Sequence, residues 1–119
     1  MSPDDATLPV IDYEQALENA AGDREIFDAV CESAMQEIPL LYPDLVRALE
    51  RSEISSGQRL AHTIKGAARV IAAVKTMTHA EQIELALAEG ELDKARATMD
   101  ALSCAIGELK AELDGATES

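Results

Sequence analysis

The stretch LDKARATMDALSCAIGELKAEL, residues 92–113, decides the fold class of this chain. Its apolar residues recur in alternating steps of three and four, at Leu92, Ala95, Met99, Leu102, Ile106, Leu109 and Leu113. This spacing places them on one face of a helix, and it is the pattern that lines the interior of an antiparallel helical bundle. We therefore predict a helix over about 91–113 that packs against other helices.

Apolar residues at helical spacing predict four more helices upstream, and no stretch has the alternation of a strand. We expect these helices over about 13–21, from Asp23 to about Leu49, from Ser52 to about Ala73, and from 75–78 to Gly90. In the second, Pro39 and Pro43 should kink the helix and not end it, because the apolar pattern continues in phase. Its expected buried positions are Ile26, Val30, Ala34, Ile38, Leu41, Leu45 and Leu49.

Residues that commonly cap helices stand near these starts. They are Asp12 with Gln15, Asp23, Ser52, and Thr78 with Glu81. The expected fold is all-α, an antiparallel up-down-up-down four-helix bundle over residues 11–113, with the short extra N-terminal helix covering one end. We expect residues 1–10 to form a flexible acidic tail and residues 114–119 a polar C-terminal tail.

Composition and charge narrow the classes of function. The chain has 119 residues, enough for one domain, and a net charge of −13, which argues against a nucleic-acid partner. No apolar run is long enough to cross a membrane, and the polar N-terminus lacks a secretory signal, so we expect a cytoplasmic monomer with no membrane partner. In that compartment Cys31 and Cys104 are expected to be buried, reduced thiols.

The charge is unevenly distributed. Between Arg47 and Lys75 there are six basic and two acidic residues, so this segment carries +4 and the rest of the chain −17. A local basic surface on an acidic protein suggests an anionic partner. The alternative is an ordinary scatter of charges on a solvated helix.

His62 lies within this basic segment and off the apolar face of its helix, which includes Leu60, Ile64 and Ile71. We therefore expect the ring to point outward. No Cys, Asp or Glu lies three or four residues away, and nearby cations would repel a metal ion, so no metal site is expected. The neighbours at helical spacing are Gln58, Arg59, Lys65, Gly66 and Arg69.

This group has the parts that a phosphoryl acceptor needs. Imidazole is a nucleophile near neutral pH, and Lys65, one turn along, can pair with a phosphoryl oxygen. Gly66 costs roughly 1 kcal/mol in a helix relative to Ala, which is reasonable if a partner must come close to His62. The alternative for Gly66 is a glycine tolerated for internal packing.

Glu84 is placed by symmetry. If the turn between the third and fourth helices centres near Ala73, position 84 lies opposite position 62. A carboxylate there could accept the Nδ1 hydrogen of His62 and leave Nε2 as the nucleophile. The alternative is a surface glutamate near the basic segment. His79 has no basic cluster beside it, and we interpret it as a surface or cap residue.

The segment Ala61-His62-Thr63-Ile64-Lys65-Gly66-Ala67-Ala68 resembles the A-H-x-L/I-K-G-S/A-S/A core of histidine-containing phosphotransfer (HPt) domains. It also resembles the phosphorylated domain of chemotaxis histidine kinases. Gly22-Asp23 before a long helix with prolines, and the Glu89-Gly90-Glu91 turn, extend the resemblance to about residues 11–113. Residues 67–73 depart from the family's S-S-A-N-L-G-A, which leaves the end of the third helix open.

The resemblance implies roles for single residues. His62 would be the phosphoacceptor, Lys65 the phosphate contact and Glu84 the residue that orients the ring. Gly66, with Gln58, Arg59 and Arg69, would form the partner-binding surface. The implied function is a phosphorelay carrier that exchanges its phosphoryl group with the aspartate of response-regulator receiver domains.

The resemblance also implies that the chain is not an enzyme. Such modules have no nucleotide site, no Gly-rich phosphate loop is present here, and no cofactor is expected. Mg²⁺ is expected on the receiver partner. Three alternatives remain: an adaptor that binds receivers without transfer, the phosphoacceptor domain of a larger chemotaxis-type kinase, and a structural bundle with an accidental motif.

Overall fold

A computed structural model describes residues 7–118 of the chain, and within that range it contains helices and no strand. The predicted all-helical fold is confirmed. Residues 1–6 of the expected acidic tail, and Ser119, lie outside the described residues. The helices are α1 (Tyr13–Asn19), α2 (Arg24–Glu50), α3 (Ile54–Val70), α4 (Val74–Ala88) and α5 (Leu92–Glu118).

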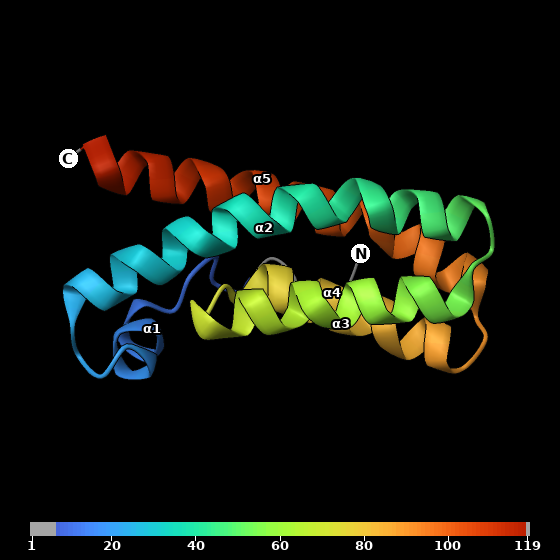
Figure 1. The fold of residues 1–119 in the computed structure, drawn as a ribbon, viewed down its shortest axis with the longest axis horizontal. Helices are drawn as coiled ribbons and strands as arrows, with labels where there is room; N and C mark the ends of the chain where they lie inside the picture. The colour runs from blue at the N-terminus through green and yellow to red at the C-terminus, as the bar shows by residue number, and fades with distance from the viewer. Residues whose placement is uncertain (1–6, 119) are drawn as a thin grey trace.

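The four long helices lie along the longest dimension of the molecule, which measures 41 × 28 × 23 Å (Figure 1). In this view α2 and α5 lie on one side and α3 and α4 on the other, while α1 lies at one end beside the start of α2. Helices α3 and α4 make the most extensive contact, followed by α4 with α5 and α2 with α3. The α3–α4 pair is therefore the best-packed part of the fold.

The core follows the apolar stripes of the helices. The stripe of α5 is buried or half-buried throughout, as predicted, and Leu102 and Leu109 are completely buried. Alanines such as Ala61 and Ala80 lie between the larger side chains and let helices approach closely. The largest completely buried aliphatic side chains are Ile38, Leu45, Ile64, Ile71, Ile83, Leu102 and Leu109.

The prediction for the start of α2 is wrong by one residue. Ile26 is 47% exposed, and Phe27 and Cys31 are buried in its place. The expected steps 26, 30, 34 and 38 are all four residues long, and such steps drift around a helix that has 3.6 residues per turn. Steps of four, three and four, through 27, 31, 34 and 38, stay on the buried face.

Helix ends agree with the sequence at two of four positions. The Asp12 carboxylate accepts a hydrogen bond from the Gln15 backbone N–H at 3.1 Å, and Asp23 accepts from the N–H of Glu25 at 2.9 Å. Ser52 does not cap α3, and Thr78 lies inside α4, which already begins at Val74.

The two missed starts share one cause. Ser52 and Ala72 each adopt a positive φ, of 55° and 52°, so the chain reverses within three residues and the next helix begins at once.

Helix α3 ends at Val70, three residues before its expected end at Ala73. Helix α2 continues through Pro39 and Pro43, as predicted. Helix α5 extends to Glu118, five residues beyond the end predicted from its apolar stripe.

Candidate functional site

His62 lies in the middle of α3 and points away from the core. Its side chain is 65% exposed, which confirms the predicted outward position. The buried residues of α3 are Gly57, Ala61, Ile64 and Ala68, a spacing of four, three and four that defines the inner face. His62 lies one residue beyond Ala61, about 100° around the helix, and therefore next to the α4 side of that face.

Glu84 of α4 contacts the ring of His62. The distance from His62 Nδ1 to Glu84 Oε2 is 2.7 Å, so the predicted contact between the two side chains is confirmed. The turn between the helices is centred at Ala72, one residue before the expected position. The pairing survives this shift because α3 and α4 pack side by side along their length.

Lys65 binds the same carboxylate, a pair that the sequence analysis missed. The distance from Lys65 Nζ to Glu84 Oε1 is 2.6 Å, and the lysine side chain is only 13% exposed. Lys65 and His62 lie three residues apart on one side of α3, so both can reach a single residue across the helix pair. Each oxygen of Glu84 therefore has its own partner on α3.

The electrostatics of Glu84 fix its protonation state. Burial alone would raise the pKa of this carboxyl, but the hydrogen bonds from Lys65 and His62 outweigh burial and hold the pKa below its ordinary value. Glu84 is therefore ionised at neutral pH and can only accept hydrogen bonds. In a neutral imidazole, the hydrogen must then be on Nδ1, which leaves the lone pair on Nε2.

Four further residues of α3 were predicted from the sequence to face a partner. Arg59 and Arg69 are exposed, and Gln58 and Gly66 are half-buried. Within the part of the chain that the structure describes, neither arginine side chain forms an ion pair or a hydrogen bond. A Cβ placed on Gly66 would meet no atom within 4 Å, so internal packing does not require a glycine there.

His79 is buried, and our interpretation of it as a surface or cap residue is wrong. It is 6% exposed, and its Nδ1 lies 3.0 Å from the amide oxygen of Gln82. Because α4 begins at Val74, His79 is not in the first turn, and it shares the inner face with Thr76 and Ile83. The cysteines also differ from the expectation: Cys31 is buried and Cys104 is exposed, and both are free thiols.

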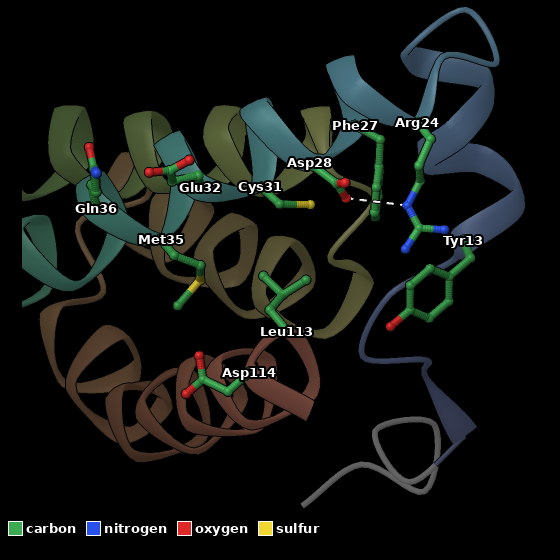
Figure 2. Close-up of a pocket in the computed structure, with 10 residues that line it drawn as sticks. All are labelled: Tyr13, Arg24, Phe27, Asp28, Cys31, Glu32, Met35, Gln36, Leu113 and Asp114. Atoms are coloured by element: carbon green, nitrogen blue, oxygen red, sulfur yellow. Dashed lines mark hydrogen bonds and ion pairs between the residues drawn. The ribbon is translucent and has the colours of Figure 1, made fainter. Parts of the chain in front are cut away.

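A pocket of about 600 Å³ lies away from this group, between the start of α2 and the end of α5 (Figure 2). Phe27, Met35 and Leu113 give it an apolar lining, and no residue of α3 or α4 contributes. Burial, followed by the Asp28 carboxylate, raises the pKa of the Cys31 thiol in this pocket to about 11. This thiol is therefore protonated at neutral pH and a poor nucleophile.

No group of three or more His, Cys, Asp and Glu side chains within residues 7–118 is arranged to hold a metal ion. In the same range, no helix is long and apolar enough to cross a membrane.

Comparisons with known proteins identify the family. The model of the Hpt domain matches residues 25–118, which include all four long helices except Arg24. No curated protein and no solved structure matches the chain significantly. Hpt domains take part in phosphorelays of two-component signal transduction as phosphohistidine carriers, not as catalysts, and they interact with receiver domains. Since the match covers well over half of its length, the chain belongs to the Hpt domain family of histidine phosphotransfer modules.

Proposed function

We propose that His62 accepts a phosphoryl group on Nε2 and exchanges it with the aspartate of response-regulator receiver domains. One observation carries the proposal: Glu84 binds Nδ1 at 2.7 Å while the rest of the ring is exposed. A nucleophile that receives phosphate from another protein must project from the surface. His62 does so with its reactive nitrogen already selected.

The transfer itself involves one bond broken and one formed. The Nε2 lone pair attacks the phosphorus of the receiver's aspartyl phosphate, the N–P bond forms, and the P–O bond to the aspartate breaks and leaves a carboxylate. The ring then carries a positive charge, because Nδ1 keeps its hydrogen. The ionised Glu84 stabilises this charge directly, since its Oε2 remains hydrogen-bonded to Nδ1.

Surface charge suits a receiver partner. Receiver domains present an acidic pocket with Mg²⁺ around the aspartate, and the basic segment between Arg47 and Lys75 is complementary to such a pocket. The chain itself would need no nucleotide and no cofactor. The proposal includes a cytoplasmic monomer with α2 to α5 in antiparallel up-down-up-down order. The short turns after Glu50, Val70 and Ala88 support that order.

The test is incubation with a phosphorylated receiver domain, followed by mass measurement and mapping of the label. We expect one acid-labile phosphoryl group on His62 and none on the His62→Gln variant. A label that persists in His62→Gln, or a label on His79, would contradict the proposal. An adaptor would bind the receiver without any label, and a kinase-linked domain would be labelled by its kinase and not by the receiver.

Two variants test the approach to His62. Lys65→Ala should slow transfer without abolishing it, because lysine supplies charge and a partner for Glu84 but no bond to phosphorus. Gly66→Val should block docking while His62 stays intact. Gly107→Val is the matched control, because Gly107 lies exposed on α5 and a Cβ there also meets no atom within 4 Å. Equal transfer rates for the two valine variants would remove the close-approach role from Gly66.

A further inference from the structure

Lys65 already forms an ion pair with Glu84 in the unphosphorylated protein. Its Nζ lies 2.6 Å from Glu84 Oε1, and its side chain is 13% exposed. A phosphoryl group on His62 would bring roughly two negative charges to the exposed side of the ring. Lys65 could neutralise them only by leaving Glu84, which lies on the inner side of the same ring.

Arg69 is better placed than Lys65 to bind the negative charge of a phosphoryl group on His62. It follows His62 by seven residues, almost exactly two turns, so the two side chains lie along one line of α3, roughly 10 Å apart along the axis. Helix side chains tilt toward the N-terminus, so an Arg69 side chain extended along α3 would point back toward the position of His62. Arg69 is exposed and has no ion-pair partner among residues 7–118.

Gly66 leaves the path between them open. It precedes Arg69 by three residues, on the strip of helix surface that the Arg69 side chain covers when it leans back. Apart from its two chain neighbours, no side chain lies within 4 Å of a Cβ added to Gly66, so this strip is unoccupied, by Arg69 as well, in the unphosphorylated protein. The missing side chain thus clears the approach of a partner and also the path of Arg69 toward the ring.

The backbone at Arg69 is hydrogen-bonded by a residue of α1, which precedes the region that matches the family. The Asn19 side-chain amide of α1 donates hydrogen bonds to the carbonyls of Arg69 at 3.3 Å and Val70 at 3.2 Å. Both carbonyls lie in the last turn of α3, where the helix itself offers no partner, and the Arg69 carbonyl also accepts a hydrogen bond from the Ala72 N–H at 3.0 Å. Helix α1 therefore fixes the base from which the Arg69 side chain extends.

From these observations we propose that Arg69 is the cation that binds the phosphoryl oxygens of phosphorylated His62, by reaching back over Gly66. The inference rests on the proposed function, since it requires a phosphoryl group on Nε2. The guanidinium is always charged and has several N–H donors in a planar fork that suits phosphate. Lys65 holds Glu84, the residue that contacts the ring, in the unphosphorylated protein.

Arg59 is a matched control for this role. It is also an exposed arginine of α3 without an ion pair among the described residues, and it lies three residues from His62. Because it precedes His62, a side chain extended toward the N-terminus of α3 points away from the position of His62. Both variants remove one positive charge from the same helix, and they differ in the side of His62 on which the arginine lies and in its distance along the helix.

The experiment uses the whole chain phosphorylated with phosphoramidate, so no partner protein contributes. Phosphorus NMR then follows the last ionisation of the phosphoryl group in wild type, Arg69→Ala, Arg69→Lys and Arg59→Ala. A nearby guanidinium favours the doubly charged phosphoryl group, so Arg69→Ala should raise the phosphoryl pKa by about half a unit. Arg69→Lys should retain part of the effect, and Arg59→Ala should titrate like wild type.

The outcomes separate the two proposals. A His62 signal with the same titration in wild type and Arg69→Ala would overturn the role of Arg69 and leave the proposed function intact. Equal shifts in Arg69→Ala and Arg59→Ala would also overturn it, because they would reflect the general basic field. Absence of any phosphohistidine signal from His62 would overturn both proposals. Circular dichroism of each variant checks that the helices are intact.

Discussion

The two histidines of this chain lie on the two best-packed helices and differ in nearly every respect. His62 of α3 is 65% exposed at its side chain, and its Nδ1 binds an ionised carboxylate. His79 of α4 is 6% exposed, and its Nδ1 faces the neutral amide of Gln82. The same imidazole is therefore placed once at the surface beside a charged acceptor and once inside the bundle.

The difference shows which features make a histidine reactive toward another protein. Exposure gives access, and a charged acceptor at Nδ1 both selects Nε2 as the nucleophile and stabilises the charge that forms on the ring. Gln82 can orient the ring of His79, but a neutral amide stabilises an imidazolium far less. The position on the helix decides exposure, and for His62 the charge beside the ring comes from Glu84 on the facing helix.

The largest expected contrast is in chemical modification of the two rings. Carbethoxylation by diethyl pyrocarbonate should modify His62 at least about a hundredfold faster than His79, because the buried ring reacts only after local opening. Mass mapping of the modified peptides over time measures both rates. Similar rates would contradict the burial of His79.

The next effect concerns the charge beside His62. Glu84→Gln keeps an acceptor for Nδ1 but removes the negative charge, and we expect labelling of His62 by a phosphorylated receiver to slow by roughly tenfold. Glu81→Gln is the control, since Glu81 is exposed and one turn earlier on α4. If both variants are labelled at the wild-type rate, Glu84 does not assist transfer.

The same variant carries a prediction about pH. The pKa of Glu84 is lower in the folded chain than in the unfolded chain, so its contribution to stability is present above the unfolded pKa. That contribution disappears as the pH falls through the folded pKa. Urea unfolding of wild type and Glu84→Gln should therefore differ at neutral pH and converge in acid. A constant difference over that range would exclude the ionisation of Glu84 as its cause.

Substitution of His79 should affect the stability of the fold more than substitution of His62, the reverse of their expected chemical reactivity. His79→Ala removes a buried, hydrogen-bonded side chain and should lower the free energy of unfolding by about 1–3 kcal/mol. His62→Ala removes an exposed ring and should change it by no more than about 0.5 kcal/mol. Urea denaturation of both variants provides the measurement. A larger loss for His62 would mean that its contact with Glu84 stabilises the fold as well as the ring.

The smallest effects come from two glycines on α3. Gly66→Ala should raise stability by up to about 1 kcal/mol, because alanine favours the helix and meets no neighbour. A Cβ on Gly57 would lie 3.1 Å from Leu87 and 3.3 Å from Leu49, so Gly57→Ala should be destabilising by about 1 kcal/mol. Thermal unfolding resolves changes of this size, and equal shifts would refute the distinction.

The sequence predicted the fold and the centre of the candidate site because both depend on periodicity. The 3-4 stripe of α5, the outward position of His62 and its pairing with Glu84 all follow from residues per turn and from a short connection. The prediction from sequence was wrong where two adjacent apolar residues could each belong to the buried face of a helix. Ile26 and Phe27 are both apolar and adjacent, and Phe27 is the one that packs into the core and against Tyr13 of α1, with ring centroids 6.2 Å apart.

Two other misses have physical reasons. The burial of His79 depended on where α4 begins, and the positive φ of Ala72 moved that start to Val74. The Lys65–Glu84 pair could not be predicted, because a lysine has a long side chain and several exposed directions open to it. Helical spacing shows that Lys65 can reach Glu84, but the choice between that carboxylate and solvent depends on packing around both side chains.

The segment before α2 connects to the turn between α3 and α4 by backbone as well as by side chain. The Asp12 N–H donates to the carbonyl of Ala72 at 2.9 Å, and the Lys75 N–H donates to the carbonyl of Pro9 at 3.2 Å. Asp12 and Pro9 lie before the region that matches the family, residues 25–118. A chain trimmed to that region would leave the α3–α4 turn open to solvent, and its amide hydrogens would exchange sooner. We therefore expect the cooperative folding unit to begin earlier in the sequence than the family match.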